Sequence, residues 1–161
     1  MLCLASRKIE NGAGHEAGRV LLAQLYRQYC GGEMPPILCT PRGKPYWQDS
    51  LLHFSISHTK HHVFCAISDR PIGIDAEEAD RDISLKLADK ILSPGERAQF
   101  DRAPDKRLAL LTFWVLKEAQ AKLTGEGIRF HPTHTDFSLD DPRVTVQNNC
   151  LLAMMEDEYA V

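Results

Sequence analysis

Two segments of the sequence carry side chains that could do chemistry together. Asp75 and Glu77 are two residues apart at the end of a segment typical of a β-strand, so both carboxylates point to the same side. Downstream, Glu118 and Lys122 are four residues apart and share one face of a predicted helix, with Lys117 beside them. Three carboxylates that converge repel each other unless a cation lies between them. Because Mg²⁺ prefers a few carboxylates together with waters and phosphate oxygens, the pattern predicts a magnesium site that handles phosphate.

The same residues also have an ordinary structural interpretation. An aspartate that follows a strand is common in turns. A Glu–Lys pair on a solvated helix face stabilises the helix by only about 0.3 kcal/mol. Since the spacing alone favours this interpretation, the magnesium site needs support from the rest of the sequence.

Apolar periodicity and turn residues predict the elements that must position these side chains. The predicted elements are helices over 15–30 and 105–123, a helix that begins at the capping box Ser93-Pro94-Gly95-Glu96, strands over 52–57, 63–67 and 72–75, and strand-like patches at 137–139 and 144–146. The short turn 68–71 predicts that 72–75 pairs antiparallel with 63–67. Lys44 falls in a turn between short extended pieces. The mixture of elements indicates an α+β fold.

Composition excludes several classes of protein. At 161 residues the chain suits one domain, and its apolar fraction of 43% and charged fraction of 25% are ordinary for a globular protein. No apolar run is long enough to span a bilayer, and the N-terminus lacks the pattern of a secretory signal, so we expect a cytoplasmic protein without a membrane segment. The five scattered cysteines are interpreted as reduced thiols, and a net charge of −3 argues against nucleic acid as a partner.

The motifs, taken in order, resemble the signature of the 4′-phosphopantetheinyl transferases. The paired core of that signature corresponds to Gly73-Ile74-Asp75-Ala76-Glu77 and to Phe113-Trp114 followed by Lys117-Glu118-Ala119 and Lys122. Three further segments are similar to the larger, Sfp-like branch: Gly43-Lys44-Pro45, Phe54-Ser55-Ile56-Ser57-His58-Thr59, and Ser93-Pro94 with Glu96. Each motif alone is weak, but five in the same order and spacing are specific.

The resemblance implies a fold and an activity. The fold would be a single domain over 1–161 made of two similar α/β halves, approximately 1–75 and 76–161, which form a pseudo-dimer with the active site between them. The activity would be Mg²⁺-dependent transfer of the 4′-phosphopantetheine arm from coenzyme A to a serine of an acyl or peptidyl carrier protein, with release of 3′,5′-ADP. Carrier protein and coenzyme A are therefore the expected partners, and Mg²⁺ the expected cofactor.

The resemblance also implies roles for individual residues. Asp75, Glu77 and Glu118 would hold Mg²⁺, and Glu118, Lys122 and Asp75 would be the catalytic group, with Glu118 as general base. Lys117 and Lys122 would offset charge on the pyrophosphate. The remaining candidates for contacts with coenzyme A phosphates are Lys44, His58, Arg42 and Arg19. Arg19 is equally well explained as a solvated helix residue, and the capping box explains Glu96.

Two alternatives and one structural expectation remain. The chain could be a non-catalytic relative that binds coenzyme A or a carrier protein, or a metal-dependent hydrolase of a nucleotide pyrophosphate. Most of the strand that usually precedes the helix near Arg19 in this branch is expected to be missing, and residues 158–161 resemble the start of the last strand. A missing strand leaves an unpaired sheet edge, so we expect lower stability or self-association.

Overall fold

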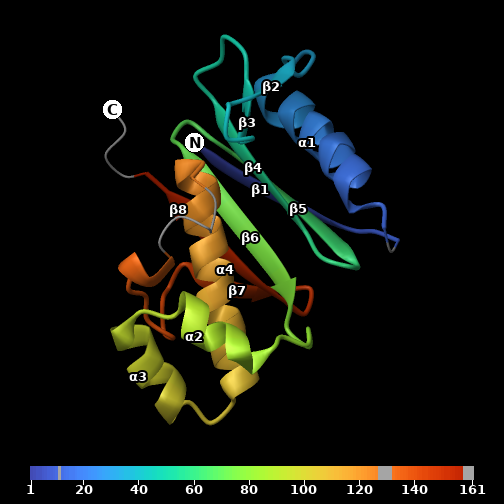
Figure 1. The fold of residues 1–161 in the computed structure, drawn as a ribbon. Coiled ribbons are helices and arrows are strands. Elements are labelled where there is room, and N and C mark those ends of the chain that lie inside the picture. Colours follow the sequence, from blue (N-terminus) through green and yellow to red (C-terminus); the bar gives the residue numbers. More distant parts are fainter. Residues whose placement is uncertain (11, 127–131, 158–161) are drawn as a thin grey trace.

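The computed structural model describes residues 1–10, 12–126 and 132–157. The fold is α+β and contains two three-stranded antiparallel sheets and one β-hairpin (Figure 1). The first sheet has the order β1-β5-β4, with β1 at Leu2–Lys8, β4 at His53–His58 and β5 at His62–Ser68. The second has the order β6-β8-β7, with β6 at Ile72–Glu78, β7 at Val144–Gln147 and β8 at Cys150–Glu156. The hairpin is formed by β2 (Ile37–Cys39) and β3 (Pro45–Trp47).

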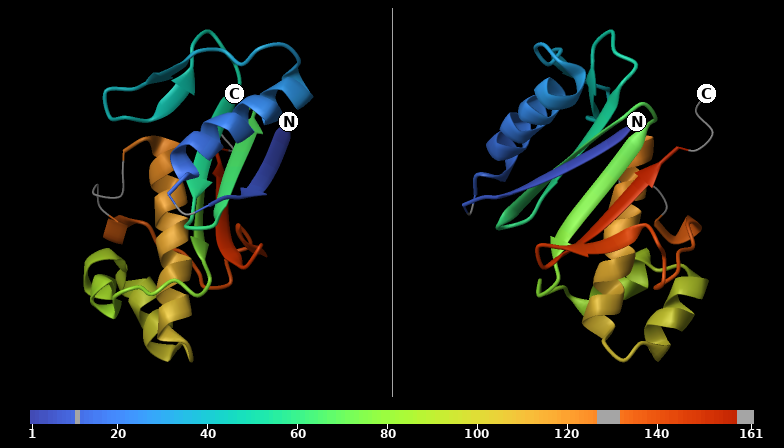
Figure 2. Two further views of the ribbon diagram at one scale, coloured as in Figure 1. Left: turned by 90° about the vertical axis from the view of Figure 1, so that its right-hand side faces the viewer. Right: turned by 180° about the vertical axis from the view of Figure 1, so that it is seen from behind.

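The two sheets and two helices stack in layers (Figure 2). Helix α1 (Gly14–Cys30) buries its leucines against Val63, Cys65 and Ile67, on one face of β5. On the other face of β5, Phe64 and Ala66 pack against residues of β6 and β8. Helix α4 (Lys106–Thr124) covers the opposite face of the second sheet. Both faces of β5 are covered by other elements. This explains why residues 63–67 form a continuous apolar run instead of alternating apolar and polar residues.

The predicted pairing between 72–75 and 63–67 is wrong. β6 pairs instead with β8, from Ile72 opposite Glu156 to Glu78 opposite Cys150. β5 has no free edge to offer, because β1 pairs along one side and β4 along the other. The turn after Ser68 therefore carries the chain out of the first sheet and into the second. β6 and β4 still lie next to each other, where the Ser55 hydroxyl accepts a hydrogen bond from the backbone N–H of Ile74 at 3.0 Å.

The predicted helices are present. The capping box at Ser93 is confirmed, since its hydroxyl accepts from the Glu96 N–H and the Glu96 carboxylate accepts from the Ser93 N–H. α4 begins after the N-cap Asp105 and ends at Gly125, whose φ of 74° is the left-handed conformation that favours glycine. Three helical elements lie between β6 and α4: a 3₁₀ turn at Leu85–Leu87, α2 at Ala88–Ile91 and α3 at Pro94–Arg102. A second 3₁₀ turn, at Pro132–His134, precedes β7.

Three other expectations have different outcomes. A strand does precede α1, so the expectation that most of it would be missing is wrong: β1 pairs with β5 along its whole length. Its apolar pattern is weak because it is an edge strand in which Cys3 is the one buried residue. Residues 137–139 are not a strand, although Phe137 is buried in the core. The predicted start of a last strand at 158–161 lies outside the described residues.

The structure bears on two expectations that were drawn from the composition, one about the cysteines and one about membrane segments. All five cysteines lie within the described residues and are free thiols. Across residues 1–10, 12–126 and 132–157, no helix combines the length and apolar character that crossing a bilayer requires.

α4 approaches the second sheet very closely at Gly73. A Cβ atom at this position would lie 2.2 Å from the Ala119 carbonyl oxygen and 2.4 Å from the Leu123 backbone nitrogen. These distances are far below contact distance, and both atoms belong to the backbone of α4. Only glycine therefore lets α4 approach β6 this closely, and this approach brings the side chains of α4 to the carboxylates of β6.

We predict that Gly73→Ala destabilises the protein by about 3 kcal/mol, because the added methyl group forces α4 away from β6. The measurement is the urea midpoint of unfolding. Gly32→Ala is the matched control, since Gly32 has open space around its Cβ position and a φ of 71°. Its cost should be limited to backbone strain of about 1 kcal/mol. Equal losses in the two variants would contradict the close approach at Gly73.

Candidate active site

Asp75 is the buried centre of the candidate site. It lies on the face of β6 that meets α4 and is only 6% exposed. Its Oδ1 atom accepts hydrogen bonds from Lys122 Nζ at 2.7 Å and from the Ser57 hydroxyl at 3.0 Å. Its Oδ2 atom is buried and has no hydrogen-bond partner among the described residues. A buried carboxylate oxygen left without a partner is costly, and it is the kind of ligand that a hard cation takes.

Lys122 joins three elements at this point. From α4, its ammonium group donates to Asp75 on β6, to Ser57 Oγ at 3.1 Å and to the Ile56 carbonyl at 3.4 Å, the last two on β4. The Lys122 side chain is 33% exposed, so one part of the group faces solvent. The predicted face of α4 is therefore the one that meets β6.

Glu77 lies beside this group but has its own cation. Its carboxylate forms an ion pair with Arg81, four residues later. Burial raises the pKa of Glu77 to about 7, with Arg81 acting against the rise and the charge of Asp75 adding to it. The indole of Trp114 on α4, whose ring lies under Arg81, also acts to lower this pKa. Glu77 is thus held between the end of β6 and helix α4.

Glu118 completes the set of three carboxylates. It is partly buried, and burial raises its pKa, to which the charge of Asp75 adds. Asp75 thus acts electrostatically on both glutamates. Repulsion among the three is the condition under which a cation is favoured.

The three carboxylates do not converge as tightly as the sequence suggested. Within the described part of the chain, no three His, Cys, Asp or Glu side chains are arranged closely enough to hold a metal ion. Two of the three carboxylates have protein cations as partners: Arg81 pairs with Glu77, and Lys122 with Asp75 Oδ1. The feature that fits a cation is the partnerless Asp75 Oδ2, next to two carboxylates of raised pKa.

Two adjoining clefts open onto this group. One, of about 430 Å³, is lined by Arg19, His58, Asp75, Glu77 and Lys122 among others. The other, of about 290 Å³, shares Lys122 and is lined also by Arg42, Lys44 and Glu118. The structure thus brings every predicted site residue except Lys117 to one or other of these two adjoining clefts, which together are called the groove.

Lys44 and Arg42 contact the C-terminal end of α4. Lys44 Nζ donates to the Leu123 carbonyl oxygen, and burial lowers the pKa of Lys44. Arg42 forms an ion pair with Glu126 at 3.7 Å. Both cations therefore line the smaller cleft and have protein partners of their own.

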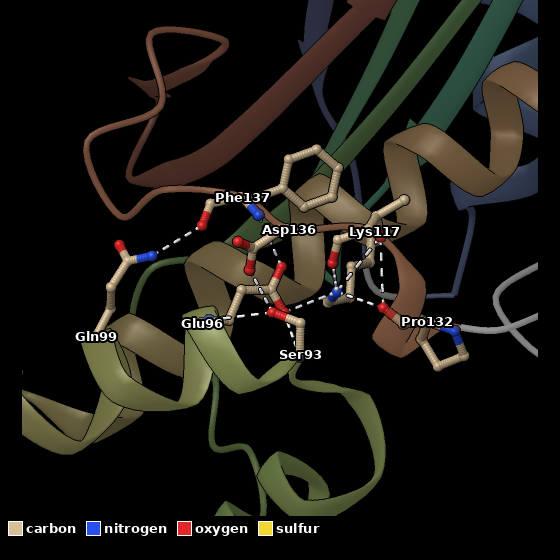
Figure 3. Close-up of polar contacts among 8 residues, drawn as sticks. Ser93, Glu96, Gln99, Lys117, Pro132, Asp136 and Phe137 are labelled. Atoms are coloured by element: carbon tan, nitrogen blue, oxygen red, sulfur yellow. Dashed lines mark hydrogen bonds and ion pairs between the residues drawn. The ribbon is translucent and has the colours of Figure 1, made fainter.

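Lys117 is not part of this group. Its side chain is 1% exposed and forms an ion pair with Glu96, with Nζ 2.8 Å from Oε2 (Figure 3). Lys117 does not line either cleft, so its placement gives no support to the predicted contact with a pyrophosphate. A helix turns by about 100° per residue, so the neighbours Lys117 and Glu118 face different surroundings.

Sequence reasoning missed two polar residues of the site. Ser57 accepts from the Ala76 N–H at 3.0 Å and contacts both Asp75 and Lys122, so it connects the two sheets at the site. Its place in the quoted segment 54–59 was the only signal. Arg81 follows β6 in a turn, and nothing in the sequence distinguished it from a surface residue.

Comparisons with known proteins assign the chain to a family. A sequence model of the 4′-phosphopantetheinyl transferase superfamily matches residues 71–159, which include Asp75, Glu77, Glu118 and Lys122. The chain belongs to this superfamily. The match spans β6, α4 and the second sheet, whereas Arg19, Arg42, Lys44 and His58 lie outside it.

Curated members of the superfamily match longer or shorter parts of the chain. The 4′-phosphopantetheinyl transferase psf-1 of Bacillus pumilus is 34% identical over 118 residues, which are 70% of this chain and 50% of that protein. Sfp of Bacillus subtilis strain 168 is 38% identical over 53% of this chain and 39% of its own length. The holo-[acyl-carrier-protein] synthase of Geobacillus kaustophilus is 40% identical over 42% of this chain and 58% of its own length. The chain thus spans about half the length of the curated relatives it matches.

We predict that Ser57→Ala lowers the free energy of unfolding by about 1 to 3 kcal/mol, because the buried Ala76 N–H loses its acceptor. Chemical denaturation measures the loss. Ser84→Ala is the control, since Ser84 is exposed and its side chain makes no capping bond. A change within about 0.5 kcal/mol in both variants would show that the serine bridge between β4 and β6 contributes nothing.

Proposed function

We propose that this member of the superfamily transfers the 4′-phosphopantetheine arm of coenzyme A to a serine of an acyl or peptidyl carrier protein and requires Mg²⁺. The observation that carries the proposal is the group of Asp75, Lys122 and Glu118, which line the groove in the part of the chain that matches the superfamily. The partnerless Asp75 Oδ2 gives the metal a place to bind. The names of the relatives, which include transferases and a holo-[acyl-carrier-protein] synthase, support the same reaction class.

The proposed metal ligands are Asp75, Glu77 and Glu118. When bound there, Mg²⁺ supplies positive charge between these carboxylates and the pyrophosphate of coenzyme A. Lys122 lines both clefts and is the candidate for stabilising the charge on the leaving 3′,5′-ADP. His58 and Arg19 in the larger cleft, and Arg42 and Lys44 in the smaller one, are candidates for the phosphates.

In the proposed reaction the serine oxygen attacks the phosphorus that carries the pantetheine arm. A bond forms between this oxygen and the phosphorus, and the bond from the phosphorus to the oxygen that bridges to the second phosphate breaks. 3′,5′-ADP leaves with that oxygen. Glu118, which faces the cleft, accepts the serine proton directly or through a water.

We also propose that the two layers of the fold correspond to the two halves of the superfamily's pseudo-dimer. The first would contain α1 with β1, β5 and β4, and the second α4 with β6, β8 and β7. The change of sheet falls between Ser68 and Ile72, so Asp75 would belong to the second half and the groove would lie at the junction.

The decisive experiment is intact-mass analysis of a panel of apo carrier proteins incubated with this protein, coenzyme A and Mg²⁺. We expect one carrier class to gain the mass of one phosphopantetheine arm. Glu118→Gln should lower the rate at least about 100-fold, because the reaction loses its base. EDTA should abolish the reaction, and the control Glu33→Gln, on an exposed loop, should not affect it.

The other outcomes select the alternatives. If calorimetry detects coenzyme A binding but no carrier gains mass, the protein is a non-catalytic relative. If coenzyme A is cleaved when no carrier is present, the protein is a hydrolase of the pyrophosphate. Either result would reject the transferase.

A separate prediction concerns the metal. Asp75→Asn should lower the affinity for Mg²⁺ by about 10-fold or more, because it replaces the charged Oδ2 with a neutral atom. Titration calorimetry, or binding of Mn²⁺ followed by electron paramagnetic resonance, measures the affinity directly. Asp82→Asn, an exposed residue, is the control. Unchanged affinity in a folded Asp75→Asn protein would remove Asp75 from the ligand set.

A further inference from the structure

A completely buried ion pair joins α4 to the start of α3 (Figure 3). The side chains of Lys117 and Glu96 are 1% and 0% exposed, and their charged atoms are 2.8 Å apart. The pair lies on a different face of α4 from Glu118, Ala121 and Lys122, which line the smaller cleft. Neither residue lines the two clefts.

Both charged groups have a full set of polar partners. Glu96 Oε2 also accepts from the Ser93 N–H at 2.9 Å, and Oε1 accepts from the Phe137 N–H at 3.1 Å. Lys117 Nζ donates in addition to the carbonyl oxygens of Pro132 and Thr135. The pair therefore ties α4 to α3 and to the segment that precedes β7.

Such a pair is not needed for stability alone. Removing two charges from water costs roughly what their attraction returns, and apolar residues of similar size often stabilise a core equally well. What charged hydrogen bonds add is direction, because each donor must point at its acceptor. Apolar contacts alone would allow α4 to rotate or shift slightly. A lysine on α4 that is hydrogen-bonded to three oxygens prevents such movements.

We infer that Lys117 is a positioning residue: its ion pair with Glu96 sets the rotation of α4, so that Trp114, Glu118 and Lys122 meet β6. On the β6 side, the Trp114 ring lies under the Arg81 guanidinium that pairs with Glu77, and Lys122 binds Asp75. The catalytic consequence rests on the proposed transferase function, whereas the geometric part does not. Lys117 itself does not contact coenzyme A.

The test uses two variants of the full chain. Lys117→Met leaves the buried Glu96 carboxylate without a counterion, and the melting temperature should fall by roughly 10 °C. Glu96→Gln combined with Lys117→Met removes both charges and retains an acceptor oxygen at position 96, so most of the lost melting temperature should return. Lys90→Met, on the exposed surface of α2, is the matched control.

The first readout needs no substrate. The chain contains two tryptophans, so a ¹⁵N spectrum contains two indole signals, and Trp114→Phe assigns them. In the double variant we expect the Trp114 signal to move by more than its line width, because the indole shifts relative to the Arg81 guanidinium that lies over its ring. The signal of Trp47, in the other core cluster, should stay in place.

The second readout is the transferase assay. In the double variant kcat should fall about 10-fold or more while the KM for coenzyme A changes less than about 2-fold, since misplaced catalytic groups lower the rate without removing a binding contact. If melting temperature, Trp114 signal and kcat all return to the wild-type values, the pair is structural only and the inference is overturned. A Trp114 shift with unchanged kcat would overturn its catalytic part.

Two further results are distinguishable from these. A large rise in KM with unchanged kcat and an unmoved Trp114 signal would mean that Lys117 binds substrate, which overturns the inference. If the wild-type protein modifies no carrier, the proposed function fails, and the melting temperature and the Trp114 signal still decide whether the pair sets the position of α4.

Discussion

The site depends on the direct approach of the α4 backbone to β6 at Gly73. A methyl group there would overlap the backbone of Ala119 and Leu123, so the two elements lie closer than any residue other than glycine would allow at this position. At this separation Lys122 reaches Asp75 and contacts β4 at the same time. A wider gap would let water between the charges and would weaken each interaction. The glycine therefore determines both the packing of the second half of the chain and the electrostatics of the groove.

Local features of the sequence predicted local structure well. The capping box at Ser93, the helix over 105–123 and the strand that carries Asp75 follow from side chains a few residues apart, and the structure contains each of them. The partner of that strand could not be predicted, because pairing depends on which edges remain free once all strands are present. β1 was missed for a related reason, since an edge strand with one buried residue carries almost no apolar alternation.

The same distinction applies to the site. Residue types and helical spacing correctly placed Glu118 and Lys122 on the face that meets β6. They did not show that Arg81 would bind Glu77, that Ser57 would bridge the sheets, or that Lys117 would be buried with Glu96. Each of these contacts joins residues whose approach is set by the tertiary fold. Lys117 shows the consequence most clearly, because its charge suggested a phosphate contact and its position assigns it to the core.

The charges around the groove also bear on how metal and substrate would bind under the proposed function. Asp75, Glu77 and Glu118 are balanced in part by Lys122 and Arg81, and burial already favours protonation of the two glutamates. A pyrophosphate that bound alone would be repelled by these carboxylates. A divalent cation that bound alone would be repelled by the ammonium group of Lys122, whose Nζ lies 2.7 Å from Asp75 Oδ1. Bound together, the two bring opposite charges, so each reduces the electrostatic cost of the other. Binding of the metal should therefore raise the affinity for the nucleotide, and binding of the nucleotide should raise the affinity for the metal by the same factor. Under the proposed function, Asp75 Oδ2 is the ligand atom that the metal would bind.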